Sequence, residues 1–127
     1  MKIQAVDHVQ IAMPAGGEDQ ARAFYGVLLG LREKPKPPVL AVRGGCWFQG
    51  AGAEIHLGVD PDFRPARKAH VAFKVDEIGS FRERARNAGY EVREDDDIEG
   101  VDRVFVFDPF GNRLEFVRPE APGFSRA

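Results

Sequence analysis

Four side chains of the kind that bind divalent metal ions occur in segments that read as β-strands. They are the three histidines of the chain, His8, His56 and His70, and the carboxylate of Glu115. Neutral imidazole and carboxylate are the usual protein ligands of zinc, nickel, iron and manganese. Because alternate residues of a strand project to the same face, each of the four can point to one side of its sheet. We therefore expect one divalent ion, Zn, Ni, Fe or Mn, to be held by these four residues.

These four residues occupy repeated positions in the sequence. Aligning DHVQIAM with AHVAFKV places His8 on His70, and aligning EIHLGV with RLEFVR places His56 on Glu115. The separations nearly agree, at 48 residues (56 − 8) and 45 residues (115 − 70). A single strand histidine is more often structural than a ligand, and Glu115 alone would read as an edge-strand charge. The shared placement of all four favours a common site, with the strands expected to run through each histidine.

The elements that must position these residues also repeat. The first half predicts a strand over VDHVQIAMP, then a helix over EDQARAFYGVLLG that ends at Gly30. Extended segments follow over LREKP, VLAVRGGCWFQG and AEIHLGV. The apolar residues at helical spacing are Ala21, Phe24, Tyr25, Leu28 and Leu29. This half therefore reads strand, helix, strand, strand, strand.

The second half follows the same order. A strand over KAHVAFKV precedes a helix that begins near Asp76, carries Ile78, Phe81, Ala85 and Ala88 on one face, and ends at Gly89. Strands over YEVRED, VDRVFVFD and NRLEFVRP complete it, and no regular element is predicted beyond Pro119. We expect one domain made of two modules, residues 1–59 and 69–119, joined by the linker 60–68. Since units of about 60 residues bury little surface alone, the modules should share a core or pair with another chain.

The composition gives no indication of a nucleic-acid or membrane partner and favours one compartment. The chain has 127 residues, with 18 basic and 20 acidic side chains and a formal charge of −2. This balance provides no basic surface for nucleic acid or for an anionic membrane. No apolar run approaches the roughly 20 residues of a membrane-spanning helix. The single cysteine, Cys46, cannot form an internal disulfide, so we expect a cytoplasmic protein in which Cys46 is a core residue.

Several further residues are candidates for contact with a substrate. Gln10 should share a face with His8 and could hydrogen-bond substrate, although a structural role is equally compatible with its position. Trp47 is either a core residue or a wall of the pocket, and Arg103 is either a surface charge or a receptor for an anionic group. Glu54 could orient His56 by a hydrogen bond, or remain a solvated strand charge.

At these residues the chain resembles the vicinal oxygen chelate superfamily, which includes glyoxalase I, extradiol dioxygenases, and fosfomycin- and bleomycin-resistance proteins. The closing motif DPFGNRLEF, the opening histidine strand and the helix end AFYGVLLGL carry the resemblance. It implies an α+β fold of paired βαβββ modules that form a cupped, mixed β-sheet around a metal. It also implies ligands from the first and last strands of each module, at His8, His56, His70 and Glu115.

The resemblance further implies a mechanism and an assembly. The metal would bind two neighbouring oxygens of a small substrate and act as a Lewis acid, with Glu115 as a general base. Chains of this length in the family form homodimers, so the site could be shared between subunits.

Three activities remain open from the sequence. The first is a metal-dependent enzyme of lyase or isomerase type, and the second is an extradiol-type dioxygenase. The third is a metal-free small-molecule binding protein of the bleomycin-resistance type. The residues after His8 include no arginine for glutathione, which argues against glutathione-dependent glyoxalase activity. His56 as a fourth ligand would occupy room that ring cleavage needs for catechol and oxygen.

Overall fold

A computed structural model of the protein describes residues 1–119 and divides the chain into two compact units. The first unit ends at Pro65 and the second begins at Ala66, so the division falls within the segment 60–68. Residues 120–127, for which the sequence predicts no regular element, lie outside the described residues. Among residues 1–119, none of the helices has the length and apolar character needed to cross a membrane.

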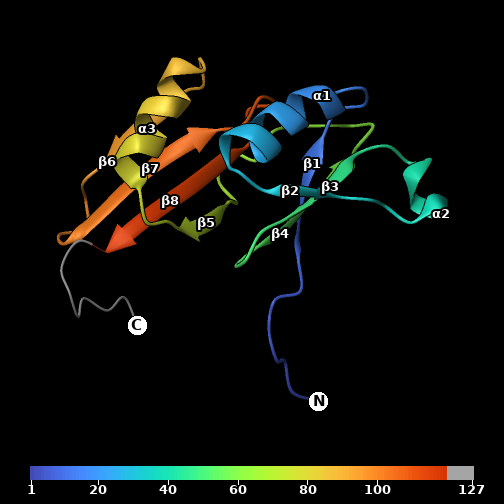
Figure 1. Ribbon diagram of the computed structural model, residues 1–127, viewed down its shortest axis with the longest axis horizontal. Coiled ribbons are helices and arrows are strands. Elements are labelled where there is room, and N and C mark those ends of the chain that lie inside the picture. The colour runs from blue at the N-terminus through green and yellow to red at the C-terminus, as the bar shows by residue number, and fades with distance from the viewer. Residues whose placement is uncertain (120–127) are drawn as a thin grey trace. The chain divides into compact units, whose positions relative to one another are not determined.

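The first unit is built on a four-stranded mixed sheet (Figure 1). In spatial order its strands are β1 (Val9–Met13), β4 (Glu54–Val59), β3 (Cys46–Gln49) and β2 (Arg32–Lys34). β1 runs parallel to β4, while the β4–β3 and β3–β2 pairs are antiparallel. The sheet therefore places the first strand of the unit directly beside its last, which brings the two predicted ligand segments together.

One face of this sheet is apolar and lies under the helical segment. That segment consists of α1 (Glu18–Ala21) followed by the π-helix η1 (Arg22–Leu28), and Gly30 with its φ of 72° turns the chain into β2. The sequence predicted one ordinary α-helix here. Instead the Leu29 N–H donates to the carbonyl of Phe24 at 2.9 Å, five residues back, and these wider turns leave Leu29 only half-buried.

The core of the first unit alternates along each strand. Met13 of β1, Ile55 and Leu57 of β4, and Phe48 of β3 are all almost fully buried, and Tyr25 stacks on Phe48 with ring centroids 5.9 Å apart. Cys46 lies in this core, as the sequence predicted, and burial raises the pKa of its thiol to about 11. The intervening positions face the other side of the sheet, here called the polar face, and include Gln10, Trp47, Glu54 and His56.

The segment before β3 differs from the sequence prediction of a continuous extended stretch. Residues Pro38–Ala41 form a short helix, α2, that begins at a proline, a residue suited to a first helical turn. Gly45 follows with φ of 80°, and a Cβ there would lie 2.1 Å from the carbonyl oxygen of Leu57. The close approach of the two backbones therefore requires glycine, and β3 begins only after it.

The second unit repeats this topology. Its strands, in spatial order, are β5 (Val71–Lys74), β8 (Arg113–Pro119), β7 (Val101–Phe107) and β6 (Val92–Asp95). β5 runs parallel to β8, and the remaining pairs are antiparallel. The helix α3 (Ile78–Asn87) packs on one face, with Phe81 against Phe116 of β8 at 4.4 Å between ring centroids. Both units thus confirm the predicted α+β fold and its strand order.

A hydrogen-bonded turn sets the start of β8. In DPFGN, the Asp108 carboxylate accepts from the backbone N–H groups of Phe110 and Asn112, each at 2.9 Å. The buried Asn112 side chain accepts from the Ala66 N–H at 2.8 Å and donates to Asp108 at 2.9 Å. This network ties the first residues of the second unit to the strand that carries Glu115.

Candidate metal centre

The strand registers confirm that the four predicted ligands occupy equivalent positions in the two units. In the first unit Gln10 pairs with His56, and His8 precedes Gln10 by two residues. In the second unit Ala72 pairs with Glu115, and His70 precedes Ala72 by two residues. One detail of the prediction is wrong. His8 and His70 lie immediately before β1 and β5 rather than within them, because regular pairing with β4 and β8 starts one residue later.

Three rings form a stacked column on the polar face of the first unit. The His56 ring lies 4.0 Å from that of His8, with an interplanar angle of 17°, and 4.0 Å from that of Trp47, with an angle of 7°. Because the His8 and Trp47 rings both stack on the His56 ring at 4.0 Å, they lie on opposite faces of it. Trp47 is opposite His56 in the β3–β4 register, so its indole supports the buried His56 while His8 remains exposed.

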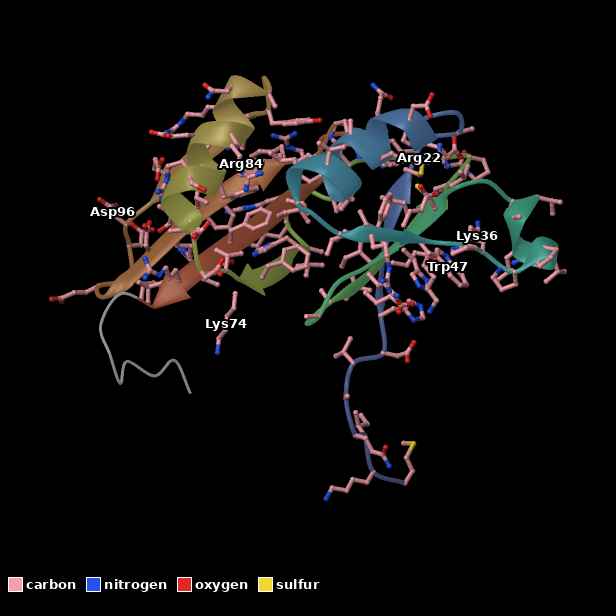
Figure 2. All side chains as sticks on the ribbon, viewed as in Figure 1. Arg22, Lys36, Trp47, Lys74, Arg84 and Asp96 are labelled. Carbon is pink, nitrogen blue, oxygen red and sulfur yellow. The ribbon has the colours of Figure 1, made fainter. Side chains whose placement is uncertain are left out.

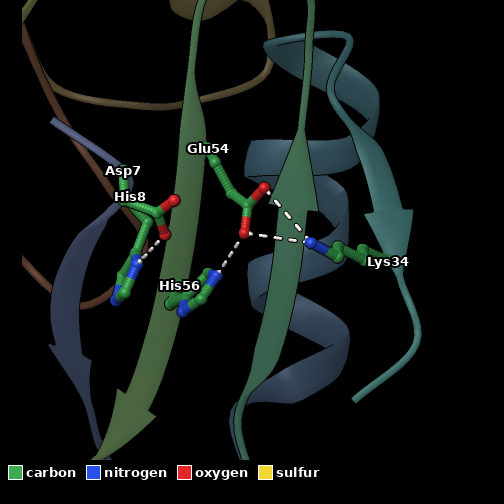
Figure 3. A network of polar contacts seen from close by, with 5 residues as sticks. All are labelled: Asp7, His8, Lys34, Glu54 and His56. Carbon is green, nitrogen blue, oxygen red and sulfur yellow. Dashed lines mark hydrogen bonds and ion pairs between the residues drawn. The ribbon is translucent and has the colours of Figure 1, made fainter. Parts of the chain in front are cut away.

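Carboxylates determine which nitrogen of each ring carries hydrogen in the first unit (Figure 3). His8 donates from Nδ1 to Asp7 Oδ2 at 2.9 Å, and His56 donates from Nε2 to Glu54 Oε2 at 2.7 Å. These hydrogen bonds hold the pKa of Asp7 and that of Glu54 below their ordinary values. A neutral imidazole has one N–H, so the lone pairs are left on His8 Nε2 and His56 Nδ1. The expected role of Glu54 in orienting His56 is present in this hydrogen bond.

Glu54 is itself held by a lysine. Lys34 Nζ lies 3.3 Å from both carboxylate oxygens of Glu54, and it comes from β2, two strands away from β4. Figure 3 shows the resulting series from Lys34 through Glu54 to His56. The lysine keeps the carboxylate in place and ionised, and through it the tautomer of His56 is fixed.

In the second unit His70 lies between two acceptors. Its Nδ1 donates to the carbonyl oxygen of Lys68 at 2.7 Å, and its Nε2 lies 2.9 Å from Glu115 Oε1. With Nδ1 protonated, the neutral ring directs the lone pair of Nε2 at a carboxylate oxygen. Such a pair of electron donors is stable only with a proton or a metal cation between them.

The donor set fits a divalent metal ion. Histidines that bind metals donate their second N–H to a carboxylate or a backbone carbonyl, and all three histidines do so here. His8 and His56 are stacked, so the exposed His8 ring must turn before both lone pairs can reach one ion. Among residues 1–119, His, Cys, Asp and Glu side chains form no group of three or more that could hold a metal. The structure brings two of the predicted ligands together in each unit, and metal binding by them, like the four-residue centre, stays a prediction.

The predicted substrate-binding residues lie on the same polar faces. The exposed Gln10 side chain covers Gly58, where an added Cβ would lie 2.7 Å from Gln10 Nε2. Trp47, marked in Figure 2, is half-buried on the His56 face and lies outside the apolar core. Arg103 pairs with Asp95 at 2.6 Å, and its Nη1 lies 3.6 Å from Glu115 Oε2. Contact of these residues with substrate stays a prediction.

One residue on this face was missed by sequence reasoning. Arg113 precedes Glu115 by two positions in β8, so both side chains project to the same side. Its guanidinium carbon lies 3.9 Å from the centroid of the Phe105 ring. The alternation of side chains along NRLEF already places Arg113 on the same face as Glu115, so the sequence could have predicted its position.

Comparison with known proteins agrees with this architecture. The family model of the Glyoxalase/Bleomycin resistance protein/Dioxygenase superfamily matches residues 5–116. The chain therefore belongs to this superfamily, and the predicted resemblance is confirmed. No curated protein matches the sequence significantly.

Solved structures extend the comparison to the fold. A Bacillus anthracis protein described as belonging to the glyoxalase family is 49% identical, with a TM-score of 0.88 over 94% of this chain and 98% of that chain. The fosfomycin resistance protein FosX of Listeria monocytogenes has a TM-score of 0.76 at 17% identity, over 92% of this chain and 94% of its own. Another FosX structure, a complex with Mn(II) and sulfate, has a TM-score of 0.74 at 18% identity, over 91% of this chain and 90% of that chain. The FosX structures are similar in fold.

Proposed function

We propose that this protein is a divalent-metal-dependent enzyme, of lyase or isomerase type, that acts on a small substrate with two neighbouring oxygens. The observation that carries the proposal is the hydrogen bonding of the histidines. Each of the three has one nitrogen engaged by an acceptor, which leaves the other nitrogen with a lone pair. His8, His56, His70 and Glu115 would hold the ion. The Mn(II) complex of the similarly folded FosX supports a divalent metal.

The residues of the second unit provide the groups for proton transfer. A bound divalent ion supplies Lewis-acid polarisation of the substrate oxygens. Glu115 is buried, and a carboxylate oxygen that is not bound to the ion would accept a proton from the substrate, while the lone pair of His70 Nε2 would bind the ion. Burial of Glu115 limits competing contact with water. Proton abstraction next to a polarised carbonyl is therefore the reaction that we assign to Glu115.

Metal affinity tests this proposal directly. Calorimetric titration of EDTA-treated protein with Mn(II) and with Zn(II) should show stoichiometric binding, and His56→Ala, His70→Ala and Glu115→Ala should each lose it. Glu83→Gln removes a carboxylate from the exposed surface of α3 and should leave affinity unchanged. A wild-type protein that binds neither metal would overturn the proposal in favour of a metal-free binding protein. Oxygen consumption with a catechol and ferrous iron would instead identify the dioxygenase.

We also propose that the protein is a homodimer and that the metal centre is shared between subunits. A double variant of the first unit, His8→Ala with His56→Ala, can be mixed with one of the second unit, His70→Ala with Glu115→Ala. If sites are shared, mixed dimers regain one intact site, and random exchange restores about a quarter of the wild-type Mn(II) capacity. If each site lies within one chain, mixing restores nothing. Light scattering of the wild-type protein gives the oligomeric state independently.

A further inference from the structure

An arginine on the Glu115 face of the second unit lacks an anionic partner among the described residues. Arg113 is half-buried, no ion pair of its side chain occurs within residues 1–119, and its Nε is buried without a hydrogen-bond partner. A guanidinium cannot lose its proton near neutral pH, so it retains its charge there. Partial burial of such a cation is unfavourable unless an anion accompanies it.

The surroundings of Arg113 hold its plane in a fixed orientation. Its guanidinium carbon lies 3.9 Å from the Phe105 ring centroid, and Phe105 is opposite Glu115 in the β7–β8 register. The ring also contacts His70 edge-on, with centroids 5.7 Å apart. Stacking on Phe105 covers one flat side of the guanidinium, so the N–H donors along its edge remain for a ligand.

Arg103 completes this surface without competing for the same ligand. Its Nη2 pairs with Asp95 at 2.6 Å, and its guanidinium carbon lies 5.2 Å from the same Phe105 ring. Asp95 is therefore ion-paired with Arg103, whereas Arg113 interacts with the Asp95 carboxylate only at longer range and forms no ion pair among the described residues. Like Arg113, Arg103 has a buried Nε without a hydrogen-bond partner. Two guanidinium groups, each with a buried Nε that has no hydrogen-bond partner, thus lie around a single aromatic ring.

We infer that Arg113, with Arg103 beside it, binds an oxyanion of the substrate, a carboxylate or phosphoryl group, next to Glu115. This inference rests on the proposed function and specifies its substrate class as a small anionic molecule. Planar guanidinium groups bind such oxygens through two parallel N–H bonds, and the stacked orientation of Arg113 provides the donors in one plane. The anionic group would direct the reactive oxygens of the substrate toward the side of the sheet that carries Glu115 and His70.

The test uses phosphate and acetate as probes and needs no metal. EDTA-treated protein, labelled with ¹⁵N, is titrated with each anion at constant ionic strength, and the Nε–H resonances of Arg113 and Arg103 are followed. We expect saturable shifts of the Arg113 resonance. Arg113→Gln should weaken the affinity for the better probe at least tenfold, and Arg113→Lys should retain part of it because it keeps the charge without the planar donors.

A matched control lies on the opposite face of the same sheet. Arg84, marked in Figure 2, is also an arginine over a phenylalanine, with its guanidinium carbon 5.9 Å from the Phe81 ring centroid. Arg84→Gln should leave anion affinity unchanged. Equal affinity in wild type and Arg113→Gln, or shifts that do not saturate in the wild type, would overturn the inference. The wild-type shifts decide the matter even if a variant fails to fold.

Mn(II) titration of the same proteins separates this inference from the proposed function. Arg113→Gln should retain the wild-type Mn(II) affinity because Arg113 is not a predicted ligand. His70→Ala should lose Mn(II) while keeping most of its phosphate affinity. If the wild type binds no metal but Arg113 still binds the probes, the proposed function fails and the anion site stands. If the wild type binds Mn(II) but neither phosphate nor acetate, the proposed function stands and the anion site fails.

Discussion

Replacing Glu54 by alanine should weaken metal binding although Glu54 is not a predicted ligand. Its carboxylate accepts from His56 Nε2 at 2.7 Å and is held by Lys34 at 3.3 Å, so it keeps the hydrogen on Nε2 and the lone pair on Nδ1. Without this acceptor the His56 ring can exchange tautomers and lose the orientation that binding requires. Loss of such an orienting carboxylate typically reduces metal affinity about 10- to 100-fold, and we expect a loss in that range for Glu54→Ala.

The assay is calorimetric Mn(II) titration with three variants. Glu54→Gln keeps an acceptor oxygen at the same position and should lose less than the alanine variant. Glu33→Gln is the control, because Glu33 is a carboxylate on β2, the strand that also carries Lys34, and pairs with Arg22 at 2.9 Å instead. Long-range ¹H–¹⁵N spectra of the histidine rings report the tautomer without metal. The Nε2–H form of His56 should dominate in the wild type and not in Glu54→Ala.

The pH dependence provides a further check on the same residue. The hydrogen bond from His56 keeps the pKa of Glu54 below its ordinary value, so the carboxylate stays ionised throughout the neutral range. Its contribution should be complete above the ordinary glutamate pKa and lost only as the pH falls through the lowered value. Above the ordinary histidine pKa of about 6.5, the ratio of wild-type to Glu54→Ala affinity should therefore be constant, for example between about pH 7.5 and 8.5. The reasoning is refuted if Glu54→Ala binds Mn(II) as the wild type does while His56→Ala does not.

Three further outcomes follow from burial and hydrogen bonding. The Cys46 thiol, buried and with a pKa raised to about 11, should react with a disulfide reagent at pH 8 only after denaturation, and rapid reaction of the folded protein would contradict its burial. Phe116→Ala, which removes the ring that packs on Phe81 at 4.4 Å, should lower the free energy of unfolding by about 3–5 kcal/mol in urea titrations, and a loss below about 1 kcal/mol would show that this contact is unimportant. Asn112→Ala removes the side-chain acceptor of the Ala66 N–H and should lower the free energy of unfolding by about 1–3 kcal/mol. Hydrogen exchange of the Ala66 amide should become faster in this variant.

Much of the fold could be predicted from the sequence because it depends on local patterns. Alternating and helical spacing of apolar residues located both helical segments and the strands, and glycines such as Gly30 and Gly89 marked where the helices end. The internal repeat was also visible, since equivalent strands carry equivalent residues, and the two registers confirm it at His56 and Glu115. Local patterns failed where backbone geometry departs from the ordinary helix or strand, as in the π-helix Arg22–Leu28 and the short helix Pro38–Ala41.

The residue types and their alternation along the strands were therefore determined by the sequence alone, although His8 and His70 lie immediately before β1 and β5 rather than within them. Contacts between strands far apart in the chain were decided only by the tertiary structure. Lys34 holds Glu54 across two strands, and Arg113 stacks on Phe105 because β7 pairs with β8. These pairings depend on sheet order and register, which arise from packing the whole unit rather than from any local segment. For the same reason, the tautomers of the histidines became apparent only once their hydrogen-bond partners were in place.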